Sequence, residues 1–321
     1  MTVLTLLSAA SKRLGLQKGM YRFLKMLPVV ARDKSINDFR SAMDFCHQVS
    51  PDKGSSCISD APQFDGKQLE FDLEVIIPVY NVERYVEECV DSVLGQVTKF
   101  TYHVTIVNDG STDSSRALLS KYESDNRVTI IDQKNQGVAA ARNTALANLK
   151  GRYVCFVDSD DRLPQNAVEL LMSKAVDGDF DIAEGGYVRF DDNDRVISKS
   201  LPKGEVSGYP CMKVFKSSIW QNLRFPTGYL FEDTVCGFII NDKYQKTSMV
   251  SDYVYEYRRN TNSISFRSAS KPKSLDTLYI TLRLLKDRVA LGLPMDEKFR
   301  GKLLYQFAMN ARRLQSLKMG G

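Results

Sequence analysis

Short apolar segments alternate with amphipathic helical patterns from residue 71 onward, and this alternation constrains the fold more than any other feature. The apolar segments are 73–78, 103–107, 128–131 and 153–157. Helical patterns lie between them at 86–94, 114–122 and 138–149, and Gly151 is predicted to close the last one. Strands separated by helices predict an α/β fold, Rossmann-like, with a mostly parallel sheet covered by helices on both faces. In such sheets ligands bind at the carboxyl ends of the strands.

The last apolar segment runs directly into three carboxylates. Residues 153–157 are followed by Asp158-Ser159-Asp160-Asp161. Carboxylates this close repel one another unless a cation neutralises them, and hard oxygen ligands suit Mn²⁺ or Mg²⁺. A cation at this strand end is placed to hold a diphosphate. The alternative is a solvated acidic turn ahead of a helix whose first turn carries Pro164, and this segment alone leaves both interpretations open.

Composition limits the chemistry that the chain can use. Its 321 residues, 43% of them hydrophobic, suffice for one large or two modest globular domains. Six cysteines without a C-x-x-C pair indicate reduced thiols of a cytosolic protein. Only His47 and His103 are available, so zinc or a histidine-based triad has little material and carboxylates must carry any catalysis. No apolar run reaches the length of a membrane span, and the first apolar segment precedes Lys12 and Arg13, the reverse of a secretory signal.

Both ends of the chain are basic, although the net charge is only +5. Residues 1–32 contain six Lys or Arg and no acid, and residues 271–321 contain eleven Lys or Arg against four Asp or Glu. Leucines interleave with the N-terminal basic residues, which is typical of a helix lying on an anionic membrane surface. An ordinary amphipathic helix packed on the body explains the pattern equally well. Nucleic acid is not expected as a partner, because no recognition motif accompanies the charge.

The chain is predicted to have three parts. A helical leader and linker occupy residues 1–70, since residues 50–68 are rich in turn formers. The main domain spans 71–260, and its second half, from about 180, is more β-like with short helices from Lys213 and through 234–240. A C-terminal helical segment occupies 261–321, in which the apolar faces of two helices are marked by Leu275, Leu278, Leu282, Leu285 and Val289, then by Leu303, Leu304, Phe307, Ala311 and Leu314.

Four segments, in order and at matching spacing, give the chain a resemblance to the family 2 glycosyltransferases of the GT-A fold. The segments are Ile76-Ile77-Pro78-Val79-Tyr80-Asn81, Val107-Asn108-Asp109-Gly110-Ser111-Thr112-Asp113, Asn135-Gln136-Gly137 with Ala141-Arg142-Asn143, and Asp158-Ser159-Asp160-Asp161. The resemblance covers about residues 71–260. It implies a bacterial, metal-dependent enzyme that builds cell-surface polysaccharide.

The resemblance also implies a donor site at the three strand ends. Tyr80, with Pro78 and Asn81 beside it, is placed to stack on uracil, and Asp109 to accept from a base N–H. Gly137 and Arg142 are placed near the diphosphate, where a helix N-terminus and a guanidinium favour an anion. Asp160 is the implied metal ligand, with Ser159 and Asp158 beside it. One departure is Asn108, where many members have a second Asp.

Two further residues are implied in the second half. Glu232-Asp233 resembles the family's E-D segment, whose Asp is the general base, so that role falls to Asp233. The alternative for Asp233 is a helix N-cap. Residues 257–265 resemble a loop that closes over the donor, and Arg258 there is placed to touch the diphosphate, or else lies on a basic surface loop.

The function implied is an inverting transfer of a sugar from a nucleotide donor, of which UDP-sugar is expected, to a glycan or lipid-linked acceptor. The expected location is cytoplasmic, on the inner face of the cell membrane where it associates peripherally. Two alternatives are weighed. A sugar-nucleotide pyrophosphorylase shares a doubly wound sheet but needs a Gly-rich loop, and Pro78-Val79-Tyr80-Asn81 contains no glycine. A non-catalytic glycan- or nucleotide-binding protein would not need both Asp160 and Asp233.

Deletion of residues 1–32 is expected to weaken association with anionic vesicles more than turnover on a soluble acceptor analogue. Each basic group near an anionic surface contributes about 1 kcal/mol. Co-sedimentation with anionic and zwitterionic vesicles measures the effect. Unchanged co-sedimentation, or loss of folding on deletion, would favour the packed helix.

Overall fold

The computed structural model describes residues 38–60, 69–260 and 271–314. The basic leader 1–32, most of the predicted linker beyond residue 60, and residues 261–265 of the predicted closing loop lie outside these ranges. Contacts between residues divide the described chain into two compact units. The sheet unit comprises residues 57–227 and 235–260, and the helical unit comprises 38–56, 228–234 and 271–314. The three-part division predicted at residues 70 and 260 stays a prediction.

The sheet unit is built on one eight-stranded sheet with the strand order β3-β2-β1-β4-β7-β5-β6, and β8 pairs with β5. The strands are β1 (Phe71–Val79), β2 (Tyr102–Asn108), β3 (Val128–Asp132), β4 (Gly151–Phe156), β5 (Ile182–Phe190), β6 (Val196–Ser200), β7 (Lys213–Lys216) and β8 (Thr247–Arg258). Strands β1 to β4 are mutually parallel, with Ile77 opposite Ile106 and Val75 opposite Cys155. Strand β7 is antiparallel to β4 and β5, and β8 is parallel to β5.

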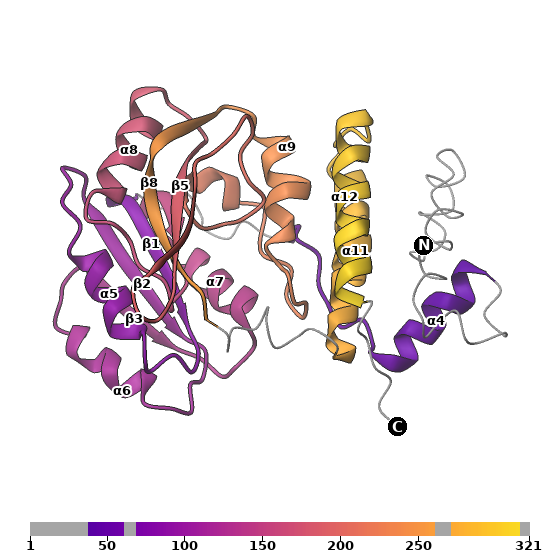
Figure 1. Cartoon of the computed structure of the whole chain (residues 1–321), viewed down its shortest axis with the longest axis horizontal. Helices are drawn as coiled ribbons and strands as arrows, with labels where there is room; N and C mark the ends of the chain where they lie inside the picture. The colour runs from indigo at the N-terminus through magenta and orange to yellow at the C-terminus, as the bar shows by residue number, and fades with distance from the viewer. Residues whose placement is uncertain (1–37, 61–68, 261–270, 315–321) are drawn as a thin grey trace. The chain divides into compact units, whose positions relative to one another are not determined.

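Helices cover both faces of the parallel part, with α5 and α6 on one side and α7 on the other (Figure 1). The helical elements are α5 (Val86–Leu94), α6 (Ser115–Leu119), η1 (Ser120–Tyr122), α7 (Val138–Leu146), α8 (Ala167–Asp177), η2 (Ser217–Trp220), η3 (Cys236–Ile240) and α9 (Asn241–Lys243). Alternate residues of β1 face α5: Val75 and Ile77 share one buried cluster with Val90 and Val93. The strand is buried on both faces from Leu73 to Val79, as expected for a central strand of a parallel sheet.

The predicted alternation of strands and helices is confirmed, with two local corrections. The helix predicted over 138–149 ends at Leu146, and Gly151 begins β4 instead of closing the helix. A Cβ atom on Gly151 would lie 2.3 Å from the backbone nitrogen of Glu74, so glycine there permits the close approach of β4 to β1. The helix predicted from Lys213 is wrong as well. Residues 213–216 form β7, because Val214 and Phe215 are buried in the sheet and Lys213 pairs internally with Glu184 at 3.0 Å.

The helical unit contains α4 (Phe39–Val49), η4 (Pro272–Leu275), α11 (Asp276–Ala290) and α12 (Glu297–Leu314). Asp38 caps α4 by accepting from the backbone N–H of Ser41 at 2.7 Å. Thr277 of α11 donates to Asn310 of α12 at 2.6 Å, so a buried polar contact aligns the two helices. Leu304 is 70% exposed and Val289 is 45% exposed, so these two residues lie outside the buried apolar faces that the sequence predicted.

None of the helices in the described residues is both long enough and apolar enough to cross a membrane.

Candidate active site

The predicted donor residues of the sheet unit gather at the carboxyl edge of the parallel strands. Val79 ends β1 opposite Asn108, which ends β2, and Asp132 ends β3 opposite Asn108. The acidic loop, residues 158–161, follows the end of β4. Parallel strands place all these ends on one edge, which is the position where ligands bind in such sheets.

Tyr80 is the exposed aromatic residue at this edge. Pro78 is buried within β1, two residues beyond the last pair with β4. Asn81 adopts a φ of 51° and joins the ends of β1 and β2: its backbone N–H donates to Ser111 at 3.1 Å and its side-chain oxygen accepts from the N–H of Thr112 at 2.8 Å. Tyr80, which is 43% exposed, therefore lies between the buried end of β1 and a turn that is hydrogen-bonded to the loop after β2.

Asp109 holds the loop that leads into α7. Its carboxylate is 2% exposed and accepts from the Gln133 amide at 2.7 Å, from the Gln136 N–H at 2.9 Å and from the Gly137 N–H at 2.7 Å. Gly137 has a φ of 91°, a conformation that favours glycine. The carboxylate thus occupies the N-terminal end of α7, where the helix dipole favours negative charge. The N–H of Gly137, predicted to meet a phosphate, has a protein partner in this structure.

Arg142 carries the connection from α7 to the acidic loop. It lies one turn into the helix, is buried, and donates to the Asp158 carboxylate at 2.8 Å. Its guanidinium lies 5.1 Å from the ring centre of Phe225. The other Asp158 oxygen lies 3.5 Å from the thiol of Cys211. Asp109, which follows β2, and Asp158, which follows β4, are therefore connected through α7: Asp109 binds its first turn and Asp158 binds Arg142.

The three carboxylates of the acidic loop have different surroundings. Asp160 is half-buried and accepts from the Asn260 amide at 2.9 Å. Burial, and then the charge of Asp158, raise the pKa of Asp160. Asp161 is fully enclosed, and burial together with the charges of Asp160 and Asp158 raises its pKa well above the usual range. A divalent cation would relieve the repulsion that these shifts express.

The donor set fits a metal that is shared with a substrate. In the described ranges no three His, Cys, Asp or Glu side chains converge to hold an ion. Mg²⁺, however, is usually bound by one or two carboxylates together with substrate phosphates, not by an all-protein cage. Asp160, the half-buried carboxylate at this edge, meets that requirement, and Ser159 beside it is buried.

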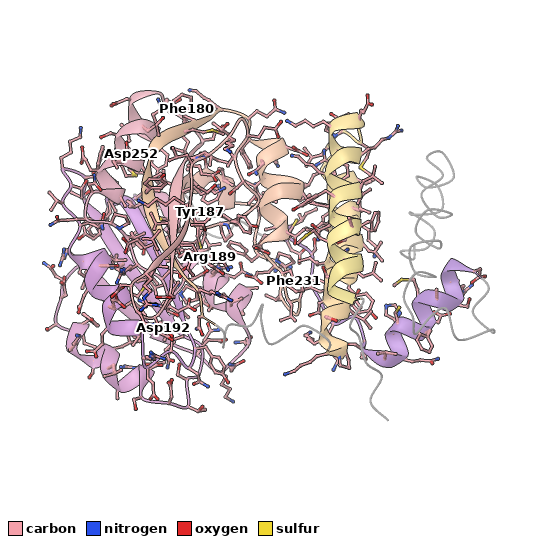
Figure 2. All side chains as sticks on the ribbon, viewed as in Figure 1. Phe180, Tyr187, Arg189, Asp192, Phe231 and Asp252 are labelled. Atoms are coloured by element: carbon pink, nitrogen blue, oxygen red, sulfur yellow. The ribbon has the colours of Figure 1, made fainter. Side chains whose placement is uncertain are left out.

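Arg258 is more enclosed than a donor-closing loop would be. It is 6% exposed, and its guanidinium donates to the backbone oxygen of Asp160 at 2.9 Å and pairs with Glu88. Phe190 lies 4.4 Å from the guanidinium carbon. Asp192, labelled in Figure 2, lies 3.8 Å from the guanidinium in the turn after β5. The alternative of a basic surface loop is wrong for Arg258, because it is buried among these partners.

Asp233 belongs to the other compact unit. Its segment, 228–234, is held to α11 by the N–H of Leu230, which donates to Asp276 at 2.8 Å. Asp233 is half-buried and immediately precedes a helical stretch that includes the π-helix η3. The helix predicted through 234–240 is thus confirmed, and the role of base stays a prediction.

Sequence reasoning missed the residues of β8 and its neighbours that contact the acidic loop. These are Tyr255, Asn260, Glu88 and Cys211. Each reaches the loop through pairing between segments far apart in the chain, and no local pattern in a single sequence signals such contacts. Tyr255 shows only as one member of an alternating strand.

The fold and the edge define a class. A parallel β3-β2-β1-β4 sheet, extended by antiparallel strands and carrying an acidic loop after β4, is the GT-A glycosyltransferase architecture. The family model "Glycosyl transferase family 2" matches residues 74–243, so the chain belongs to the family 2 glycosyltransferases. It is therefore a glycosyltransferase, and a pyrophosphorylase is not supported.

Relatives of known name agree with this assignment. GlyA of Streptococcus pneumoniae is 35% identical over 221 residues, which cover 60% of this chain and 31% of GlyA, so the match spans about a third of that relative. GlyG of the same organism is 27% identical over 247 residues, 69% of this chain and 82% of GlyG. The crystal structure of residues 1–349 of S. aureus TarS has a TM-score of 0.58 at 20% identity, covering 74% of this chain and 72% of that one, and shows the shared fold.

Substitution Asp109→Ala is expected to lower the free energy of unfolding by about 2–3 kcal/mol, because it removes the buried charged acceptor of three hydrogen bonds at the entry to α7. Urea denaturation followed by circular dichroism measures the change. Tyr80→Ala, which removes an exposed ring, should shift it by less than about 0.5 kcal/mol. An unchanged urea midpoint for Asp109→Ala would mean that the carboxylate does not hold this loop.

Proposed function

We propose that this chain is a metal-dependent, inverting glycosyltransferase that transfers a sugar from a UDP-linked donor to a glycan or lipid-linked acceptor in cell-surface polysaccharide biosynthesis. The observation that carries the proposal is the acidic loop at the carboxyl edge, where half-buried Asp160, which accepts from Asn260, lies between Asp158, which pairs with Arg142, and Asp161, which is bonded to β8. An exposed aromatic ring, Tyr80, stands at the same edge. Together they offer a surface for a base and an attachment for a diphosphate.

The names of relatives support the pathway and the donor. GgaB of Bacillus subtilis, a minor teichoic acid biosynthesis protein, is 27% identical over 227 residues, 65% of this chain and 25% of GgaB. TarS has been crystallised with UDP-GlcNAc and with UDP. A uridine ring stacked on Tyr80 would use its exposed face, and stacking of a base on an aromatic ring contributes about 1–3 kcal/mol.

Asp160 would hold the divalent cation, with the diphosphate and water completing its coordination. Mn²⁺ or Mg²⁺ bound there would neutralise the charge that develops on the departing diphosphate. The protein's own part is to keep Asp158 turned toward Arg142 and Asp161 toward β8, so that Asp160 is the carboxylate left to face the donor. The side-chain amide of Asn260 donates a hydrogen bond to one carboxylate oxygen of Asp160 and so fixes the Asp160 side chain.

Asp233 would take the proton from the acceptor hydroxyl. A sugar hydroxyl is a poor nucleophile, so in-line displacement needs a general base on the side opposite the leaving group. The basic ends of the chain support peripheral contact with an anionic membrane, the surface on which a lipid-linked acceptor is found.

Asp160→Ala is expected to abolish transfer and to remove the Mn²⁺ dependence of UDP binding. Without this ligand, a diphosphate near Asp158 and Asp161 meets only repulsion. Titration calorimetry with UDP, with and without Mn²⁺, measures the loss. Asp177→Ala, at the exposed end of α8, serves as the control and should bind as the parent does. If Asp160→Ala bound the pair as tightly as the parent, the metal assignment would be wrong.

Asp233→Asn is expected to keep donor affinity and lose most transfer, about 10²–10⁴-fold, which is the usual contribution of a general base. The parent should invert the anomeric centre, so an α-linked donor gives a β-linked product. NMR of the anomeric proton in the product decides the stereochemistry. Retention of configuration, or parental turnover in the variant, would remove Asp233 from the mechanism.

A further inference from the structure

The acidic loop is attached along its length to one strand, β8. At its start, the backbone N–H of Asp158 donates to the Tyr255 hydroxyl at 3.1 Å. Just past its end, Arg162 and Glu256 form a backbone bridge with N···O distances of 2.9 and 3.2 Å. The same strand therefore meets both ends of the loop that carries the proposed metal ligand.

Asp161 is the point where the loop and β8 interlock. One carboxylate oxygen accepts from the Tyr255 hydroxyl at 2.8 Å, and the other accepts from the Arg258 N–H at 2.7 Å. The side chain is buried, so its oxygens face β8 and not the open edge. Both side-chain oxygens therefore already have a partner on β8. A carboxylate committed in this way is an anchor and a poor candidate for a shared metal.

Arg258 and Asn260 continue the contact toward Asp160. The Arg258 guanidinium donates to the Asp160 backbone oxygen at 2.9 Å, and the Asn260 amide donates to the Asp160 side chain at 2.9 Å. The guanidinium is itself fixed by Glu88 and lies 4.9 Å from the ring centre of Tyr85. Its direction is therefore set by several partners at once, which is what a positioning group requires.

Strand β8 gives these contacts a rigid base. It pairs with β5 along most of its length, with Arg258 opposite Phe190 and Glu256 opposite Val188. A residue on a paired strand is held more tightly than one on a loop, and metal ligands need support of that kind to keep a productive geometry.

We propose that Tyr255, Arg258 and Asn260 form a positioning clamp that sets where the Asp158 and Asp160 carboxylates lie, with Asp161 as its anchor and not as a metal ligand. The inference rests on the proposed metal-dependent function and adds a division of labour among the three carboxylates. Asp160 faces the donor, Asp158 pairs with Arg142, and Asp161 holds the loop to β8.

Tyr255→Phe tests the clamp without touching a proposed ligand. The substitution removes one hydroxyl, which both accepts from Asp158 and donates to Asp161. We expect the affinity of the variant for Mn²⁺ in the presence of UDP to fall about 10–100-fold, the usual effect of losing a partner that orients a metal ligand. Electron paramagnetic resonance of the unbound Mn²⁺ measures this affinity. Turnover should fall at saturating donor and recover in part at high Mn²⁺. Tyr253→Phe, on the same strand but with its ring near Lys199, should bind Mn²⁺ as the parent does.

Asp161→Asn separates an anchor from a ligand. Its side-chain oxygen still accepts from the Arg258 N–H, so Mn²⁺ binding should weaken much less than in Asp160→Ala. The double variant Asp161→Asn with Tyr255→Phe should lose less Mn²⁺ binding free energy than the sum of the two single losses, because both substitutions act through one hydrogen bond. If Asp161→Asn lost Mn²⁺ as completely as Asp160→Ala, Asp161 would be a ligand and the clamp would be overturned.

The outcomes distinguish this inference from the function on which it rests. Parental Mn²⁺ affinity in Asp160→Ala would overturn the metal site and the clamp together. If Asp160→Ala lost Mn²⁺ binding while Tyr255→Phe kept the parental Mn²⁺ affinity, the clamp alone would be overturned. Thermal unfolding reports whether Tyr255→Phe folds. If it does not, Asn260→Ala, at a half-buried residue, carries the same test, and parental Mn²⁺ affinity in that variant overturns the clamp.

Discussion

Repulsion among the three carboxylates that follow β4 is the constraint on which the rest of the site depends. Asp158, Asp160 and Asp161 lie within four residues, and burial raises the pKa of Asp160 and of Asp161. Two unpaired charges so close in a protein interior would cost several kcal/mol. The fold answers this cost by giving each carboxylate a different partner: Arg142 from α7, Asn260 beyond β8, and the hydroxyl and N–H of β8 itself.

The parallel topology makes these partners available. Because β1, β2 and β4 end on the same edge, Asp109 at the end of β2 can hold the entry to α7, and Arg142 of that helix can reach Asp158. An α-helix rises 1.5 Å per residue, so the step from Gly137 to Arg142 spans about one and a half turns. One short helix thus connects the ends of two strands that have β1 between them.

Local pattern predicted the strands and helices of this half well, and pairing between distant segments explains what it did not predict. The sequence predicts each strand from β1 to β4 because short apolar segments alternate with amphipathic helical patterns. The polar and turn-forming residues that follow these strands mark the carboxyl edge of the sheet. Lys213 begins a strand and not the predicted helix. Its ammonium is satisfied by Glu184 and by the Ser207 carbonyl, which a sequence read locally cannot bring together. Tyr255 escaped for the same reason.

Arg258 lies in more enclosed surroundings than its predicted contact with a diphosphate suggests, and that contact stays a prediction. A guanidinium near a diphosphate is expected to be open to solvent, yet this one is enclosed by Glu88, Tyr85 and Phe190. Arg is suited to such a site because its planar group stacks on rings while its N–H groups donate in the plane. Lysine could not do both. An arginine that stacks, pairs and donates to the Asp160 backbone holds the acidic loop in place, which is the positioning role proposed for it.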